Sequence, residues 1–239
     1  MSRTAAPKAN PEALLREGTP VRDAAPTLSL LGTSALLFEA PGEMDLPSQQ
    51  RIWALAQEAE RWPEVREAVP GMSNLMLSFV RPPRGLDALQ ERLRAAWDAA
   101  APLSRPGRVV ELPVVYGGAG GPHMADVVAH TGLAVERIVE LHSTPLYPVY
   151  ALGSHPGYCY LGGMDPRIAT PRRQVPVLSI PGGAVSIGGA QTGVSASAGP
   201  SGWNTIGTTS MCFFDPQADP PAVLRPGDMI RFRVEGIVR

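Results

Sequence analysis

Residues 150–207 carry the sequence that decides the fold of this chain. They include Gly153-Ser154-His155-Pro156-Gly157-Tyr158-Cys159-Tyr160-Leu161-Gly162-Gly163, then Gly188-Gly189-Ala190-Gln191-Thr192-Gly193 and Pro200-Ser201-Gly202-Trp203-Asn204-Thr205-Ile206-Gly207. A helix does not tolerate this density of glycine and proline, because relative to alanine an interior glycine costs about 1 kcal/mol and an interior proline about 3 kcal/mol. The pattern favours short strands joined by tight turns.

Several side chains in this segment are suited to binding a small molecule. His155, Tyr158, Arg172, Gln191 and Trp203 offer polar and aromatic groups, and the glycines beside them let backbone N–H groups approach a ligand closely. A β-barrel also needs glycine in its turns, and that explanation is preferred for any single glycine. The prediction of a binding site therefore rests on the whole cluster.

The composition indicates a soluble globular protein that is long enough to bury a core. Of the 239 residues, 44% are apolar and 18% are charged, and the net charge of -1 gives no general attraction to nucleic acid or anionic lipid. Cys159 and Cys212 form no C-x-x-C pair, and we predict no metal site. Two thiols, no apolar run of about 18 residues and no signal-peptide core near the start together predict a cytoplasmic protein without a membrane partner.

The N-terminal part predicts a small domain at residues 27–101, after a disordered tail at residues 1–26. The expected strands and helices lie, in chain order, at residues 28–39, 45–63, 65–69, 74–80 and 86–98. Gly32 interrupts the first strand, and Asp45 with Pro47 marks the start of the first helix. The order β-α-β-β-α predicts a sheet covered by two helices.

Residues 102–108 predict a linker, and a second domain follows at residues 109–239. A strand is expected at residues 109–116, and a glycine run then leads into helical spacing that ends near His142. The glycine run lacks the Gly-Lys-Ser/Thr ending of a P-loop, so it predicts no phosphate cradle. We interpret His142 as a buried, hydrogen-bonded histidine, and His123 and His130 as surface residues.

The C-terminal part predicts a closed or nearly closed β-barrel. The expected strands lie at residues 148–152, 176–180, 184–187, 210–214 and 229–234. Arg225-Pro226-Gly227-Asp228 before the last strand is a good turn sequence, with proline second and glycine third.

Seven groups of short motifs then occur in the order found in a known family. They are Leu112-Pro113-Val114-Val115-Tyr116-Gly117-Gly118, Glu140-Leu141-His142-Ser143, Pro156-Gly157-Tyr158 with Tyr160-Leu161-Gly162-Gly163, Ala169-Thr170-Pro171-Arg172, Gln191-Thr192-Gly193, Gly202-Trp203 with Ile206-Gly207, and Leu224-Arg225-Pro226-Gly227-Asp228. Over residues 28–232 the sequence resembles the allophanate hydrolase subunit 1 family. That family includes the B subunit of bacterial ATP-dependent 5-oxoprolinase, a sporulation histidine-kinase inhibitor and half of the urea amidolyase carboxyltransferase domain. The resemblance implies an α+β fold, with a ferredoxin-like α/β domain followed by a cyclophilin-like β-barrel domain.

The resemblance also implies a function. It indicates one subunit of an ATP-dependent amide hydrolase that opens 5-oxoproline to glutamate and acts with a second, carboxyltransferase-like subunit. ATP is then expected at the level of the complex, and no cofactor-binding residue is assigned. On this view His155 and Arg172 are catalytic, and the substrate-binding residues are Tyr158, Gln191, Thr192, Gly193 and Trp203.

The two proposed catalytic residues have different chemistry. An imidazole has an unperturbed pKa near neutrality, which suits His155 to general acid or base catalysis. A guanidinium gives bidentate, charge-assisted hydrogen bonds, which suits Arg172 to a carboxylate or phosphate. An equally weighted alternative is that Arg172 holds its own loop in place through backbone carbonyls.

The sequence departs from the family pattern at Ser154, Ser195, Ala196, Ser201 and Thr208. We expect these changes to line one pocket, which would indicate an altered substrate or lost activity. The alternatives are a regulatory protein such as a histidine-kinase inhibitor, or a subunit of an allophanate- or urea-related amide hydrolase. A prolyl isomerase ranks last, because fold does not imply function and the Phe-His-Arg stretch of cyclophilins is absent.

Overall fold

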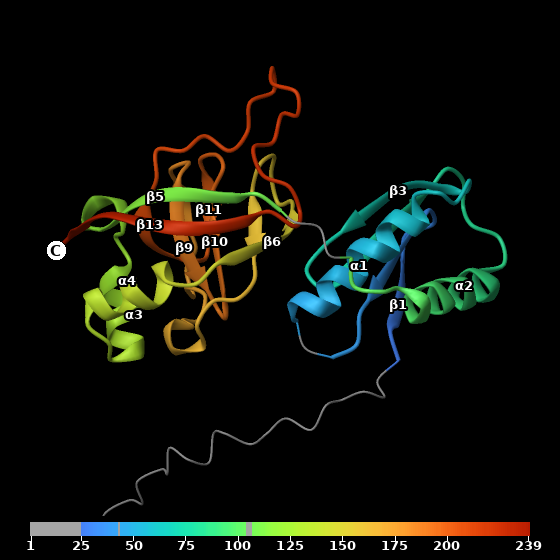
Figure 1. Ribbon diagram of the computed structural model, residues 1–239, viewed down its shortest axis with the longest axis horizontal. Helices are drawn as coiled ribbons and strands as arrows, with labels where there is room; N and C mark the ends of the chain where they lie inside the picture. Colours follow the sequence, from blue (N-terminus) through green and yellow to red (C-terminus); the bar gives the residue numbers. More distant parts are fainter. Residues whose placement is uncertain (1–24, 43, 104–106) are drawn as a thin grey trace, which may run out of the picture.

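The computed structural model describes residues 25–42, 44–103 and 107–239. It consists of a four-stranded sheet with two helices, followed by a closed seven-stranded barrel. Figure 1 shows these parts side by side, with α1 (Leu46–Ala59) next to the barrel. The expected α+β architecture is confirmed. Apart from Ala25 and Pro26, the predicted tail at residues 1–26 lies outside the described residues.

The first part is an antiparallel sheet in the order β1-β2-β4-β3. Its other elements, in chain order, are β1 (Thr27–Leu31), β2 (Ala35–Glu39), β3 (Val65–Pro70), β4 (Asn74–Phe79) and α2 (Leu86–Ala99). The single strand predicted at residues 28–39 is wrong, because Gly32 turns the chain back at φ 62° and the two halves pair as a hairpin. The order is therefore β-β-α-β-β-α.

Local signals position the helix that faces the barrel. The side chain of Asp45 accepts a hydrogen bond from the Ser48 N–H at 2.7 Å and caps α1, as predicted. The strand predicted at residues 74–80 is also confirmed as β4, in which the alternating side chains of Leu75, Leu77 and Phe79 are buried in the core between sheet and helices.

The second part is a closed barrel with the strand order β10-β7-β6-β13-β5-β12-β9. The strands are β5 (Val109–Gly117), β6 (Tyr147–Leu152), β7 (Cys159–Leu161), β9 (Ala184–Gly188), β10 (Gln191–Val194), β12 (Asn204–Thr208) and β13 (Met229–Val238). Within this barrel, β5 and β13 pair in parallel and the other neighbours are antiparallel. Two further strands, β8 (Val177–Ile180) and β11 (Gly199–Ser201), form a separate two-stranded sheet, called here the β8–β11 ribbon.

The strand predictions for the barrel are only partly right. Residues 210–214 form no strand, and Phe214 alone makes an isolated bridge, to Ala222. The sequence analysis missed β7, β10, β11 and β12, which are short and contain or adjoin glycines that indicated turns. The turn before β13 is confirmed, with Gly227 at φ 94° and the Asp228 N–H donating to the Arg225 carbonyl.

Asp228 has a structural role at this turn. Its buried carboxylate accepts hydrogen bonds from Arg108 Nη2 at 2.7 Å and from the backbone N–H groups of Arg108 and Arg225. Burial alone would raise the pKa of Asp228, but these hydrogen bonds hold it below its ordinary value. The start of β5 is thereby tied to the start of β13.

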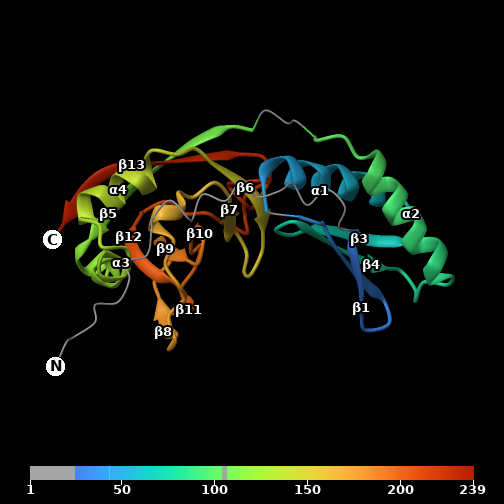
Figure 2. The ribbon, with the colours of Figure 1, turned by 90° about the horizontal axis from the view of Figure 1, so that it is seen from below.

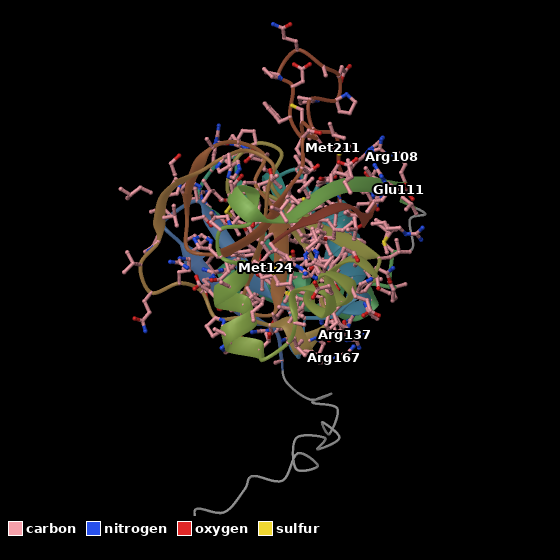
Figure 3. The ribbon with its side chains drawn as sticks, turned by 90° about the vertical axis from the view of Figure 1, so that its left-hand side faces the viewer. Arg108, Glu111, Met124, Arg137, Arg167 and Met211 are labelled. Atoms are coloured by element: carbon pink, nitrogen blue, oxygen red, sulfur yellow. The ribbon has the colours of Figure 1, made fainter. Side chains whose placement is uncertain are left out.

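Two helices and two single turns cover one side of the barrel: η2 (Gly118–Gly120), α3 (Met124–Thr131), α4 (Val135–Ser143) and η3 (Pro166–Ile168). Figure 3 shows Arg137 of α4 and Arg167 of η3 close together. The hydrogen bond from Arg167, with help from Arg137, lowers the pKa of Asp165 to about 2. His123 is not the surface residue predicted: it is buried, and its Nδ1 accepts from the Thr205 N–H at 2.9 Å.

A chain of polar groups crosses the barrel core around His142, which is fully buried as predicted. His142 Nδ1 lies 2.8 Å from the Tyr116 hydroxyl and Nε2 lies 2.8 Å from the Thr192 hydroxyl, which in turn donates to the Ser186 carbonyl at 3.1 Å. Because the Thr192 hydroxyl has one proton, it accepts from Nε2–H, and Nδ1 accepts from Tyr116. Burial lowers the pKa of His142 to about 3, so the imidazole is neutral.

The two parts of the molecule meet at a bulge in β6. The register of β6 against β7 shifts between Val149 and Ala151, so Tyr150 is the extra residue. The Tyr150 carbonyl accepts from Trp53 Nε1 at 2.9 Å and from Gln49 Nε2 at 3.2 Å, both on α1. This contact fixes α1 against the barrel. The division of the chain at residues 102–108 remains a prediction, and residues 104–106 lie outside the described ones.

Candidate functional site

A cavity of about 450 Å³ opens on one side of the barrel. Figure 2 shows that the β6–β7 connection and the β8–β11 ribbon, which both line it, project to the same side of the molecule. Its lining consists of serines, aromatic rings, one histidine, one arginine and a small-residue rim: Ser154, His155, Tyr158, Tyr160, Arg172, Ser186, Gly193, Ser195, Ser197, Ala198, Gly199, Pro200, Ser201, Gly202 and Trp203. Five of the seven predicted site residues lie together here.

A tight turn presents His155 to the cavity. Its N–H donates to the Gly153 carbonyl at 2.7 Å, and its carbonyl accepts from the Tyr158 N–H at 3.1 Å. Ser154, between Gly153 and His155, has φ 64°. This left-handed conformation is rare for a residue with a Cβ and is found most often at functional sites. His155 Nε2 is buried and has no hydrogen-bond partner among the described residues. That nitrogen is therefore an unsatisfied polar atom on a residue that lines the cavity.

Arg172 projects from a loop that other groups hold in place. Thr170 and Gly189 exchange two backbone hydrogen bonds, of 3.2 and 2.7 Å, and Asn204 Nδ2 donates to the Pro171 carbonyl at 2.9 Å. Arg172 itself is exposed, and its guanidinium makes no hydrogen bond or ion pair within the described part of the chain. Arg172 is therefore not needed to hold its own loop, and its charge is available.

Trp203 forms a wall beside Arg172. Arg172 Cζ lies 5.6 Å from the centroid of the indole ring, within the range of a cation–π interaction. The other side of the indole packs so tightly on Gly188 that an added Cβ would lie 2.4 Å from the ring. Trp203 is only 8% exposed, so it is both a core residue and a lining residue.

Tyr158 lies at the centre of an aromatic cluster in the cavity. Its ring packs edge-on against Tyr160, with centroids 4.9 Å apart, and lies 5.2 Å from the His155 ring. A Cβ at Gly193 would come within 2.8 Å of the Tyr158 hydroxyl, so Gly193 leaves room for it. Burial raises the pKa of Tyr158, which keeps the hydroxyl protonated. The hydroxyl makes no hydrogen bond to a residue that the structure describes.

The other two predicted site residues lie elsewhere. Thr192 is fully buried in the barrel core and bonded to His142. Gln191 points toward the N-terminal part, where its Nε2 lies 3.6 Å from Met44 Sδ. Both placements follow from β10 being a strand, because consecutive side chains on a strand point to opposite faces.

Of the residues that depart from the family pattern, some line the cavity and some lie elsewhere. Ser154, Ser195 and Ser201 line the cavity, as expected. Ala196 and Thr208 do not, and Thr208 packs against Gly120. The expectation that all the changes line one pocket is therefore wrong for Thr208 and Ala196.

Several residues that shape the cavity were not predicted from the sequence, among them Ser186, Tyr160 and Asn204. Ser186 and Tyr160 line it, and Asn204 fixes the loop that carries Arg172. Tyr160 stands inside a quoted motif, and Asn204 lies between the two halves of another, which was a usable signal. Ser186 stands in none, and only the pairing of β9 with β10 and β12 brings it to the cavity.

Comparison with known proteins defines the class of this chain. Residues 26–224 match the family described as carboxyltransferase domain, subdomain C and D. The chain belongs to that family.

Individual relatives show which members of the family this chain resembles in sequence. The 5-oxoprolinase B subunit of Escherichia coli O157:H7 is 48% identical over 204 residues, which cover 85% of this chain and 93% of that protein. The 5-oxoprolinase B subunit of Haemophilus influenzae is 37% identical over 210 residues, with 87% and 97% covered. The solved structure of TTHA0988 superposes with a TM-score of 0.70 at 32% identity, covering 84% of this chain but 39% of that one. The chain is a homologue of the 5-oxoprolinase B subunit.

Proposed function

We propose that this chain is the B subunit of an ATP-dependent 5-oxoprolinase, which opens 5-oxoproline to glutamate together with a second, carboxyltransferase-like subunit. The observation that carries the proposal is the cavity lined by Arg172, His155 and an aromatic wall. Neither the Arg172 guanidinium nor His155 Nε2 has a hydrogen-bond partner among the residues that the structure describes. The identity to 5-oxoprolinase B subunits along nearly the whole of their length supports it.

5-Oxoproline has a carboxylate, a flat ring and a lactam group, and the cavity offers a counterpart to each. Arg172 binds the carboxylate through charge-assisted hydrogen bonds. Trp203 and Tyr158, whose rings stand nearly perpendicular to each other at 82°, provide an aromatic corner for the ring. The Tyr158 hydroxyl and His155 Nε2 are then left for the lactam oxygen and nitrogen.

The reaction needs an activated carbonyl, because a lactam is stable to water. Phosphoryl transfer from ATP to the lactam oxygen makes the ring carbon electrophilic. One water adds to that carbon and the carbon–nitrogen bond breaks, which gives the acyl phosphate of glutamate. A second water then hydrolyses the acyl phosphate to glutamate and phosphate. In this sequence His155 takes a proton from the attacking water and returns one to the departing nitrogen.

The chain supplies only part of the machinery for this reaction. The glycines at Gly117 and Gly121 are occupied by packing, since a Cβ there would lie 2.1 Å from the Val238 carbonyl oxygen and 2.3 Å from that of Ile206. The glycine run also lacks the Gly-Lys-Ser/Thr ending of a P-loop, so we place the nucleotide site with the partner subunit. TTHA0988 fits this view, because the region like this chain is 39% of a longer polypeptide.

The location of the enzyme is a further expectation. In the described residues no helix is both long enough and apolar enough to cross a membrane. We expect the complex to act in the cytoplasm, where both ATP and 5-oxoproline are available.

The function is tested by co-expressing the chain with the partner subunit encoded beside it and measuring ADP release. We expect release that depends on 5-oxoproline and on both subunits, with glutamate as the second product. A His155→Gln complex should bind 5-oxoproline and turn it over at least about 100-fold more slowly, in the range of a lost general acid–base catalyst. ADP release unaffected by 5-oxoproline, or full activity of this chain alone, would refute the proposal.

A further inference from the structure

The β8–β11 ribbon exposes apolar side chains to an unusual degree. Leu178 in β8 is 90% exposed and Val175 just before it is 76% exposed, the highest values among the large apolar residues of the described chain. A soluble protein rarely presents a leucine so fully unless another surface covers it. The ribbon therefore has the properties of a surface that binds another protein.

The backbone of the ribbon is also unsupported. Within the described part of the chain, β8 pairs only with β11, and β11 only with β8. A two-stranded sheet is marginal in water, and an open edge is a template for pairing with another chain. Pro200 removes a donor from β11, which leaves β8 as the edge better able to bond with a further strand.

The ribbon is part of the cavity wall as well. Gly199 and Ser201 of β11 line the cavity, and Arg173, next to Arg172, donates its N–H to the Gly202 carbonyl at 2.7 Å. Figure 2 shows the ribbon standing out from the barrel on the side to which the β6–β7 connection projects. A protein that covered Leu178 would stand over the cavity mouth.

We propose that the second 5-oxoprolinase subunit docks on the β8–β11 ribbon, covering Leu178 and Val175, and thereby closes the cavity over the substrate. This inference rests on the proposed function. That partner is favoured because the sequence contains no P-loop and because the same unit in TTHA0988 is joined to further polypeptide. The partner contributes an apolar patch and a strand edge to the ribbon.

The test is the affinity of the purified chain for the purified partner, measured by titration calorimetry. Leu178→Asp and Val175→Asp should each weaken association at least about 10-fold, as expected when a charge enters the core of an interface. Neither should change the melting temperature, since neither side chain is packed within the chain. Val109→Asp is the matched control: Val109 is 54% exposed but stands in β5, which Figure 2 shows on the opposite side, and it should bind like wild type.

Three outcomes would overturn the docking proposal: wild-type affinity in both ribbon variants, an equal loss in the Val109 control, or a chain that self-associates through Leu178 in the absence of the partner. Failure of the proposed function looks different. In that case the wild-type complex forms and is weakened by Leu178→Asp, yet 5-oxoproline does not stimulate ADP release.

Discussion

The barrel contains two histidine–tyrosine pairs that differ in hydrogen bonding. One pair lies in the core and is hydrogen-bonded, and the other lies at the cavity and is not, within the described residues. In the core, His142 and Tyr116 are joined by hydrogen bonds that continue to the Thr192 hydroxyl. In the cavity, His155 and Tyr158 have rings 5.2 Å apart, and neither His155 Nε2 nor the Tyr158 hydroxyl has a partner in the described chain. Tyr158 in the cavity and Tyr116, His142 and Thr192 in the core all belong to the quoted family motifs, so motif membership alone does not separate the two sets.

The difference identifies the function of each set. A buried polar group without a partner is costly, so native cores pair almost all of them, and the core set is paired at every atom. A group left unpaired at a cavity is typically one that a ligand will satisfy. We infer that the core set stabilises the barrel and the cavity set binds substrate.

The largest expected effect concerns the two histidines. His142→Ala removes a buried ring and leaves the hydroxyls of Tyr116 and Thr192 unsatisfied, which should lower the free energy of unfolding by about 3–5 kcal/mol. His155→Ala keeps the backbone bonds of its turn and should lower it by less than about 1 kcal/mol. Urea unfolding of both variants measures this. Equal losses would show that the two sets do not differ in role.

Arg172→Ala should weaken 5-oxoproline binding by the complex by about 1.5–3 kcal/mol, or roughly 10–100-fold, because a charge-assisted bond is lost. Arg172→Lys should recover the charge without the bidentate geometry and restore binding only in part. The concentration dependence of ADP release gives the affinity, and a thermal melt should be unchanged.

The neighbouring Arg173→Ala is the control for this experiment. Arg173 is paired with Asp126, outside the cavity, and should leave the affinity for 5-oxoproline nearly unchanged. If Arg172→Ala instead lowers the melting temperature and the affinity together, the residue holds its loop and is not a binding group.

The core histidine also predicts a pH dependence of stability. Burial holds its pKa near 3 in the folded chain, whereas an unfolded histidine titrates near 6.5. Below pH 6.5 the unfolded chain takes up a proton that folded His142 does not, so stability should fall as the pH falls, by about 2 kcal/mol between pH 7 and pH 5. His142→Gln, which cannot titrate, should lack this part of the loss. Parallel pH profiles of the two proteins would contradict it.

The sequence predicted best what depends on neighbours in the chain. The helix start at Asp45 and the strand at residues 74–80 were predicted from local signals, and both are confirmed. The hairpin at Gly32 was missed, because two strands of similar composition meet there across a short turn. Local pattern does not show that the chain reverses.

At the candidate site, too, local sequence did not show how distant segments pair. Gln191-Thr192-Gly193 has the composition of a turn, and it is a strand only because β7 and β9 pair with it on either side. Once it is a strand, alternation sends Thr192 into the core and leaves Gly193 at the cavity. β7, which pairs with β10 on one side, is distant from it in the sequence. The residue types therefore indicated a binding site in this segment, but they could not show which of its side chains face the cavity.

The smallest expected effect compares two tyrosines by the same substitution, which removes one oxygen from each. Tyr116→Phe leaves His142 Nδ1 buried without a donor and should cost about 1–3 kcal/mol of stability, with no change in 5-oxoproline affinity. Tyr158→Phe removes a hydroxyl that bonds to no described residue, so stability should change by less than about 0.5 kcal/mol. The Tyr158 variant should instead lose about 1 kcal/mol of binding, or roughly fivefold in affinity, because a neutral hydrogen bond to the lactam is gone. Urea unfolding and substrate titration of both variants test this: the Tyr116 variant should lose stability but not affinity, and the Tyr158 variant should lose affinity but not stability. A Tyr158 variant that binds 5-oxoproline as wild type does would remove its hydroxyl from the site.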